Sequence, residues 1–397
     1  MRAQPGPLPE IAPDDFRECG QLNGRYPPRS LDSTPHPHGT STNLNPTDST
    51  SSVILYCRAG FEGECAQEIT ARAATFGSFG HVRAVRDSGF VEFVTTSTLG
   101  SNGLSQLADP RTMIFARQAL AVIAQLSGLP PQDRVTPILA ALGERYTRWA
   151  DVIVEAPDTN DGKALAPFCR SFGNALVGAM KKARLIDPGA PQRLHAFFPQ
   201  SDKVYLCAGD LARTSPWPQG IPRLKFPREA PSRSTLKLDE AFLVLLDDDE
   251  RARWLKPGMT AVDLGAAPGG WTWQLVRRSI RVAAVDNGPM DAALMDSGLV
   301  THVRADGFRY RPPKPVDWLV CDMVEQPRRV ATLIAQWFAE GLCRRAIFNL
   351  KLPMKKRYEE TRLCLDVVRD ALGAKADIRA KQLYHDREEI TAFAHAG

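Results

Sequence analysis

Short apolar runs separated by polar turns predict the strands and helices of the first half of the chain. Some runs are compact, as strands require, and others have apolar residues three or four positions apart, which is typical of helices. The strands expected are Val53–Tyr56, 82–85, 90–94, 151–155, 194–198 and 204–208. The helices expected are 61–74, 114–126, 135–142 and 163–183. This alternation predicts small α+β layers.

From Pro257 onward the pattern becomes a regular exchange of buried strands and helical segments. The strands expected are 259–264, 281–286, 301–304, 316–321, 345–350, 376–383 and 389–395. Strands joined by helices in this way form a mostly parallel sheet with helices on its faces. The second half is therefore predicted to be a doubly wound α/β domain.

Composition separates the remaining segments. Residues 1–50 hold nine of the 31 prolines and many Ser, Thr and Asn, so almost nothing there can pack, and we expect a disordered leader. A Pro-rich connector at 214–222 divides the two halves. A length of 397 residues agrees with two or three domains.

Charge and cysteine usage narrow the class of protein. The formal net charge of +5 permits a nucleic-acid partner without requiring one. The eight cysteines are scattered, with no CxxC pair, so no metal site is expected. The sequence has no run of 18 apolar residues and no signal-peptide core, which predicts a protein of the cytoplasm without a membrane partner.

The stretch DLGAAPGGW, Asp263–Trp271, follows an apolar run and leads into a helical pattern. A strand, a Gly-rich turn and a helix N-terminus form a place where backbone N–H groups can face a ligand. A turn with only a structural role is the alternative, because Gly and Pro punctuate any loop.

Acidic residues follow three strands in succession, and they bear on which ligand this is. Asp286, Asp306 and Asp322 each come at the end of an expected strand. A carboxylate there can accept hydrogen bonds from both hydroxyls of a ribose. NAD and S-adenosylmethionine both contain such a ribose, so this feature suits them equally. The turn lacks the GxGxxG fingerprint that a pyrophosphate needs, and so favours S-adenosylmethionine.

Longer motifs carry a family resemblance. Asp263–Trp271, SRSTLKLDEA (232–241), CDMVE (321–325), FNLKLPMKKRYEE (348–360) and QLYHDREEIT (382–391) resemble the Rossmann-fold RNA ribose 2′-O-methyltransferases. The similarity extends over residues 53–395, and is greatest to bacterial members that act on a cytidine of 23S ribosomal RNA. It implies an RNA-binding region of THUMP type in the first half, where residues 154–172 carry the likeness.

The resemblance also implies a division of the chain and an S-adenosylmethionine-dependent reaction. We expect a C-terminal Rossmann-like methyltransferase sheet, an N-terminal α+β region and a monomeric protein. The segments are a leader at 1–50, a ferredoxin-like region at 51–130, a THUMP-like region at 131–213, a basic connector at 214–236 and the methyltransferase domain at 237–397.

Site residues follow from the same resemblance. A catalytic Lys-Asp-Lys-Glu set falls on Lys237, Asp322, Lys351 and Glu389. The cofactor positions fall on Ser234, Ala267, Pro268, Gly269, Gly270, Asp286, Asp306 and Asp322. Glu388 competes with Glu389, and since neighbours on a strand point to opposite faces, only one can join the site. Ser234 has a simpler explanation as a helix N-cap.

The expected chemistry is removal of a proton from a ribose 2′-hydroxyl as it attacks a methyl group. Lys351 is the predicted base. A lysine is a poor base at neutral pH unless burial or a second cation favours its neutral form, which gives a reason for the pair of lysines.

Basic stretches at 221–237 and 350–357, together with Lys181, Lys182 and Arg184, are candidate phosphate contacts. Three other functions compete with ribose methylation: a base-directed amino methyltransferase, a cytosine-C5 enzyme that would need a nucleophile such as Cys321, and a non-catalytic rRNA-binding assembly factor.

Overall fold

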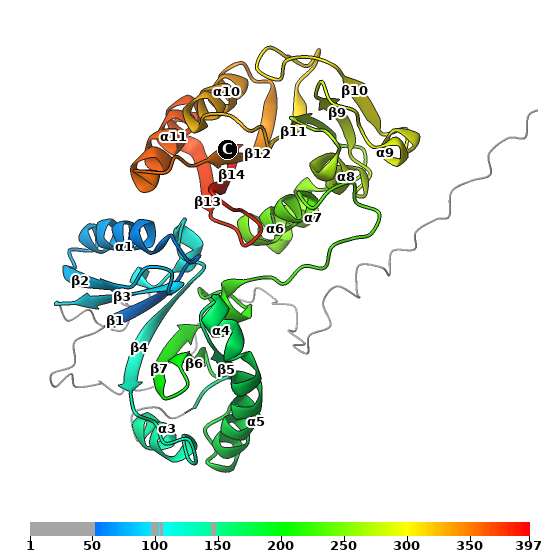
Figure 1. The fold of residues 1–397 in the computed structure, drawn as a ribbon. Helices are drawn as coiled ribbons and strands as arrows, with labels where there is room; N and C mark the ends of the chain where they lie inside the picture. The colour runs from blue at the N-terminus through cyan, green and yellow to red at the C-terminus, as the bar shows by residue number, and fades with distance from the viewer. Residues whose placement is uncertain (1–51, 97–102, 104–105, 144–147) are drawn as a thin grey trace, which may run out of the picture. The chain divides into compact units, whose positions relative to one another are not determined.

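Two seven-stranded sheets organise the part of the chain that the structure describes (Figure 1). This structure is a computed structural model, and it describes residues 52–96, 103, 106–143 and 148–397. The leader expected at 1–50 lies outside the described residues. Both sheets belong to one structural unit, which begins at Ser49.

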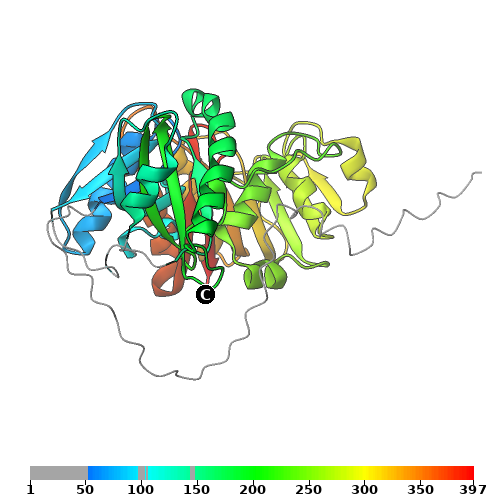
Figure 2. The same ribbon diagram turned by 90° about the horizontal axis from the view of Figure 1, so that it is seen from below.

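The N-terminal sheet has the strand order β2-β3-β1-β4-β7-β6-β5. Its strands are β1 (Ser52–Tyr56), β2 (Gly80–Ala84), β3 (Phe90–Thr95), β4 (Gln118–Leu126), β5 (Val152–Glu155), β6 (Gln192–Gln200) and β7 (Lys203–Asp210). The helices are α1 (Glu62–Thr75), α3 (Val135–Leu142), α4 (Asn160–Ala164) and α5 (Ala166–Lys182). Figure 2 shows α5 lying alongside the strands of this sheet. All six strands expected in this half are confirmed.

The helix expected at 114–126 is wrong, because this segment contains the central strand β4. Its apolar run is nearly continuous, so it fits a helix or a buried strand equally well. Pairing decides between them, since β4 bonds to β1 on one side and to β7 on the other. The strand thereby joins the regions 51–130 and 131–213 in one sheet. The single helix expected at 163–183 is also divided in two, with Pro167 in the first turn of α5.

The C-terminal sheet has the order β10-β9-β8-β11-β12-β14-β13. Its strands are β8 (Thr260–Leu264), β9 (Arg281–Val285), β10 (Val300–Val303), β11 (Val316–Cys321), β12 (Cys343–Lys351), β13 (Ala376–Lys381) and β14 (Glu389–Ala396). The first five run parallel, whereas β14 is antiparallel to both β12 and β13. The seven strands expected from the sequence are thus confirmed.

Helices cover both faces of this sheet, which confirms the doubly wound α/β fold (Figure 1). They are α6 (Thr235–Leu245), α7 (Asp248–Trp254), α8 (Gly270–Val276), α9 (Ala292–Asp296), α10 (Pro327–Ala339) and α11 (Arg357–Leu372). Alternate residues of a strand serve the two faces. Leu319 and Phe348 pack in the core with α10 and α11. Their neighbours Trp318 and Ile347 pack with α6 and α8 on the other face.

A buried lysine ties β13 to the segment that leads into β4. Lys381 donates from Nζ to the backbone carbonyls of Met113 at 2.8 Å and Ala116 at 2.6 Å, and also to that of Pro110. Burial lowers the pKa of Lys381 to about 8, and Glu68 opposes part of that effect. Next to Lys381, the backbone amide of Gln382 donates to Ile114 O at 2.8 Å.

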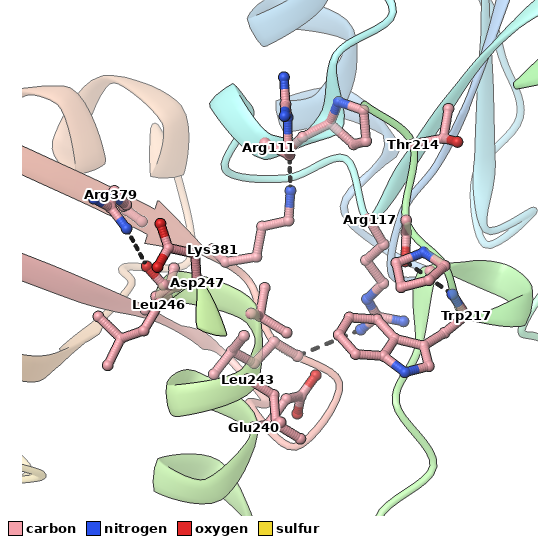
Figure 3. A pocket seen from close by; sticks show the side chains of 18 of the residues that line it. Arg111, Arg117, Thr214, Trp217, Glu240, Leu243, Leu246, Asp247, Arg379 and Lys381 are labelled. Atoms are coloured by element: carbon pink, nitrogen blue, oxygen red, sulfur yellow. Dashed lines mark hydrogen bonds between the residues drawn. The ribbon is translucent and has the colours of Figure 1, made fainter. Parts of the chain in front are cut away.

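A pocket of about 560 Å³ lies beside this junction, between α6, β13 and the connector (Figure 3). Figure 3 shows Lys381 reaching toward the segment of Arg111, while Arg117 lies near Trp217. Arg117 is itself buried and contacts Leu383 O at 3.5 Å. The loop after β13 is therefore held from the N-terminal side.

Replacing Lys381 with Met tests this junction. The change keeps an unbranched side chain but leaves the buried carbonyls of Met113 and Ala116 without their donor, each at a cost of roughly 1–3 kcal/mol, whereas the Pro110 carbonyl still accepts from the Met113 amide. We expect the free energy of unfolding, measured with urea at neutral pH, to fall by about 2 kcal/mol or more. The exposed Lys375, substituted by Met, is the control and should change little. Equal midpoints for both variants would contradict a stabilising role of Lys381.

Candidate active site

Four charged side chains meet at the carboxyl end of the parallel strands. Lys237 comes from α6, Asp322 directly follows β11, Lys351 ends β12 and Glu389 begins β14. Lys237 Nζ lies 3.4 Å from Asp322 Oδ2 and 2.5 Å from Glu389 Oε1. Lys351 Nζ lies 3.2 Å from Asp322 Oδ1 and 3.1 Å from Glu389 Oε2. Each lysine thus bridges both carboxylates, and we call these four residues the charged quartet.

The structure places Glu389, and not Glu388, in the charged quartet. Glu389 is the Cα partner of Lys351 across the β12–β14 pairing. Glu388 is 63% exposed and forms an ion pair with Arg357 at 2.6 Å. The choice that the sequence left open is thereby made by the register of two antiparallel strands.

Charge pairing dominates the electrostatics of Lys237. Burial lowers the pKa of Lys237, but Asp322 and Glu389 together outweigh it and hold that pKa above its usual value. Burial likewise raises the pKa of Glu389, and the two lysines reverse this, so the pKa of Glu389 lies below its usual range. Burial and a second cation, which were expected to favour a neutral lysine, therefore do not do so at Lys237, which stays charged.

Two polar residues behind the quartet were missed by the sequence analysis. Asn349 Nδ2 donates to Asp322 Oδ1 at 2.7 Å, and Thr391 Oγ1 donates to Asn349 Oδ1 at 2.7 Å. Both residues are completely buried. The signal was present in the spacing, because each lies two positions along a strand from a quartet residue and so shares its face.

The turn after β8 is shaped by glycines that tolerate no side chain. Gly265 has φ 78° and Gly269 has φ 119°, both in the region that favours glycine. A Cβ on Gly269 would lie 2.2 Å from Leu294 Cδ1, and one on Gly270 would lie 2.2 Å from Ser234 Oγ. The segment of Ser234 therefore touches the N-terminus of α8.

Asp286 joins this turn to the loop after β9. Its Oδ2 accepts from the Ala267 amide at 3.0 Å and its Oδ1 from the Gly288 amide at 2.7 Å. Pro268, between Ala267 and Gly269, is exposed. Asp306 follows β10, is about half exposed, and accepts from the Phe308 amide within its own loop. The structure thus brings Asp286 against the turn, whereas Asp306 is held by its own loop.

Ser234 occupies the N-cap position of α6 but makes no capping hydrogen bond. Its hydroxyl instead lies 2.7 Å from that of Ser232. The simpler explanation of Ser234 as a helix cap is therefore wrong for its side chain.

Asp263, near the end of β8, is a further buried acid in the motif. Thr272 Oγ1 donates to Asp263 Oδ2 at 2.6 Å, and within the described residues Oδ1 has no partner. Burial raises the pKa of Asp263 to about 7, and Asp322 and Asp286 add to this while Thr272 opposes it. An acceptor without a partner beneath a Gly-rich turn is a feature that a cationic or hydroxyl-bearing ligand group can satisfy.

Cys321 cannot serve as a nucleophile in this geometry. It is fully buried, and burial raises the pKa of its thiol to about 12, so the reactive thiolate is disfavoured. A cytosine-C5 enzyme therefore has no suitable nucleophile at this position.

Some side chains of the basic stretches are held by partners, and others are exposed. Arg357 is held by Glu388 and lies over the ring of Phe61, and Arg223 binds Tyr384 and Asp158. The exposed members include Lys181, Lys182, Arg184, Lys225, Lys355 and Lys356. These remain available for contact with an anionic partner.

Comparison with known proteins defines the class first. Residues 230–384 match the family model of the FtsJ-like methyltransferases. Residues 50–120 match a model described as the RlmM ferredoxin-like domain, and residues 133–209 match the N-terminal model of ribosomal RNA large subunit methyltransferase M. The second half is accordingly an FtsJ-like methyltransferase that depends on S-adenosylmethionine, and the expected ferredoxin-like fold class of the first half is confirmed.

Whole-length relatives then identify the family. Ribosomal RNA large subunit methyltransferase M of Xanthomonas oryzae pv. oryzae (strain PXO99A) is 55% identical over 353 residues, which cover 87% of this chain and 100% of that protein. The protein of the same name from Xanthomonas euvesicatoria pv. vesicatoria (strain 85-10) is 54% identical over 351 residues, with 87% and 99% covered. This chain belongs to the family of ribosomal RNA large subunit methyltransferase M.

Among solved structures, TrmN from Thermus thermophilus aligns over 87% of this chain and 99% of its own, with 15% identity and a TM-score of 0.34. In the described ranges, none of the helices combines the length and apolarity needed to cross a membrane. The same ranges contain no cluster of three or more His, Cys, Asp or Glu arranged to hold a metal ion.

The pKa of Asp263 predicts a pH dependence of stability. In the unfolded chain its pKa is near 3.8, and in the folded protein it is about 7. The folded state thus binds the proton more tightly, and stability falls as pH rises from about 4 to 7, by on the order of 4 kcal/mol at most.

Urea unfolding of the wild type and of Asp263→Asn, at several pH values between about 4 and 8, measures this contribution. The variant cannot titrate there, so its stability should decline less over that interval. The exposed Asp370, changed to Asn, is the control and should follow the wild type. Parallel curves for the wild type and Asp263→Asn would mean that Asp263 is ionised in the folded protein.

Proposed function

We propose that this chain transfers a methyl group from S-adenosylmethionine to the ribose 2′-hydroxyl of a cytidine in 23S ribosomal RNA. The observation that carries the proposal is the charged quartet, in which two lysines and two carboxylates are in mutual contact at the strand ends. Ribose hydroxyls have high pKa values, so transfer needs a base and alignment more than it needs activation of the methyl group. The names of the relatives point to ribosomal RNA of the large subunit.

Lys351 is the base in this proposal. Lys237 is held charged, and its closest contact, 2.5 Å to Glu389, is the shortest in the quartet. The contacts of Lys351 are 3.1 and 3.2 Å long, and its side chain is 23% exposed against 15% for Lys237. It is therefore the lysine better able to meet an incoming hydroxyl and accept its proton. Asp322 and Glu389 orient both lysines.

S-adenosylmethionine fits the residues around the turn. When bound, it supplies a methyl group that is electrophilic because it is attached to a sulfonium. Asp286, Asp306 and the backbone of 267–270 would hold it, with Ser234 beside the turn and Asp322 facing both the cofactor and the quartet. The unpartnered Oδ1 of Asp263 beneath the turn supports this assignment.

Target capture is assigned to the first half and to the exposed basic residues near the quartet. Lys181 and Lys182 end α5 and are exposed, and Lys355 and Lys356 follow Lys351 by a few residues. Lysines in such positions bind phosphate without reading sequence. The THUMP character of 131–213, the monomeric state and the location in the cytoplasm stay predictions.

A non-catalytic assembly factor is the main alternative. It is less favoured because burying four charges in contact costs desolvation that a purely binding protein has no reason to retain. A base-directed enzyme likewise has no use for a paired lysine base.

Replacing Lys351 with Arg tests its role as the base. A guanidinium keeps the charge but cannot accept a proton at neutral pH, so single-turnover methylation should fall by about 10²–10⁴-fold. The substrate is 23S rRNA from cells that lack this gene, and calorimetry of S-adenosylmethionine binding should show little change. Lys355→Arg, four residues along and exposed, is the matched control. A near-normal rate for Lys351→Arg would exclude Lys351 as the base.

Replacing Lys181 and Lys182 together with Glu tests RNA capture. Affinity for 23S rRNA should fall, and the slope of log affinity against log salt should shrink by about one for each phosphate that is no longer neutralised. The rate at saturating RNA should be unaffected, since neither residue is in the quartet. Lys314→Glu, an exposed lysine just before β11 and thus at the opposite end of the strand from Asp322, is the control. Equal losses of affinity in both proteins would remove α5 from the RNA-binding surface.

A further inference from the structure

Asp386 is a buried acid that the proposed mechanism does not use. It lies in the loop 382–388 between β13 and β14 and is 1% exposed. Thr391 Oγ1 lies 3.1 Å from each of its carboxyl oxygens. The same hydroxyl lies 2.7 Å from Asn349 Oδ1, and Asn349 Nδ2 reaches Asp322. Asp386 therefore stands at the far end of a hydrogen-bonded chain that ends on the quartet.

The direction of every hydrogen bond in this chain follows from Asp322. Asp322 contacts two lysines and accepts at Oδ1, so the Asn349 amide must turn its NH₂ group toward it. Asn349 then presents its amide oxygen to Thr391. This oxygen can only accept, so the Thr391 hydroxyl must donate its proton to it. A hydroxyl has only one proton, so the contact between Thr391 and Asp386 lacks a donor unless Asp386 supplies it.

The surroundings of Asp386 agree with a protonated acid. Its Oδ2 accepts from the Leu383 amide at 3.0 Å, which leaves Oδ1 to carry the proton. Burial raises the pKa of Asp386 well above its usual value, and the nearby Glu389 and Glu240 raise it further, while Lys237 opposes them. Two of these three charged groups therefore disfavour a carboxylate.

We propose that Asp386 is a neutral carboxylic acid that acts as a positioning residue, donating to Thr391 and so fixing Asn349 and Asp322. Fixing the Asn349 amide matters because a rotated amide would place its oxygen against the Asp322 carboxylate. Neutrality matters as well. Two lysines and two carboxylates balance in charge, and a further negative charge here would favour the protonated form of the base.

This inference rests on the proposed function but concerns different residues. If wild-type protein fails to methylate 23S rRNA, the proposed function fails, and unfolding of the wild type and Asp386→Asn at several pH values still decides the protonation state of Asp386. If the wild type is active, the variants of Asp386 and Thr391 test the positioning role by themselves.

Asp386→Asn is the central variant, since an amide can donate to Thr391 and accept from Leu383 without any charge. Its single-turnover rate should stay within a few-fold of the wild type, and its pH–rate profile should superimpose on that of the wild type. If Asp386 were ionised in the wild type, the Asn variant would lose a negative charge. The base would then lose its proton more easily, and the rising limb of the pH–rate profile would move to lower pH. That displacement would overturn the proposal.

Thr391 provides a matched pair of variants. Thr391→Ser keeps the hydroxyl and should remain close to wild type. Thr391→Val has a similar shape without the hydroxyl, and its rate should fall on the order of 10²-fold, the usual cost of small misplacements in an active site. Equal rates for the two variants would overturn the positioning role of the hydrogen bonds that connect Asp386, Thr391 and Asn349.

Unfolding gives a readout that does not depend on activity. An acid protonated in the folded state makes wild-type stability decline relative to Asp386→Asn as pH rises from about 4 to 7. An ionised, hydrogen-bonded carboxylate gives the opposite sign, and that result would overturn the proposal. Should Asp386→Asn fold poorly, the difference in rate between Thr391→Ser and Thr391→Val still decides whether these hydrogen bonds position the site.

Discussion

Charge balance at the strand ends is the constraint on which the site depends. Lys237 and Lys351 each contact both Asp322 and Glu389, so neither a cation nor an anion is left alone in a mostly buried place. Removing one partner from such an arrangement leaves an uncompensated charge, which is far more costly than the net benefit of the pairs. Each of the four elements that meet here must therefore hold its position for the remaining ion pairs to stay favourable.

The antiparallel strand β14 is what makes this arrangement possible. It lies between β12 and β13 and runs against both. Its first residues consequently stand opposite the last residues of β12, with Glu389 facing Lys351 and Thr391 facing Asn349. In a wholly parallel sheet, only the carboxyl ends of strands would lie at this edge. The antiparallel strand β14 places its first residues there as well.

The hairpin of β13 and β14 also connects the site to the first half of the chain. Lys381 and the amide of Gln382 bond to the segment 110–116, and Arg58 donates to Tyr384 O at 3.2 Å. The loop that carries Asp386 is thus held by the N-terminal half, by Glu240 of α6, which accepts from the amides of Tyr384 and His385, and by Thr391.

The sequence by itself determined the elements with strong periodicity and the motifs with unusual composition. The doubly wound sheet and the Gly-rich turn could be predicted because buried strands and tight turns have local sequence patterns. The positions of Lys237, Asp322, Lys351 and Glu389 followed from motifs that resemble those of the ribose 2′-O-methyltransferases. Prediction failed where the outcome depends on a partner distant in sequence. The segment 114–126 became a strand only because β1 and β7 saturate its backbone. Glu389 was among the predicted residues, but only the register with β12 decides it over Glu388. The roles of Asn349, Thr391 and Asp386 depend on contacts between residues far apart in the chain, and burial and hydrogen-bond direction exist only once the chain has folded.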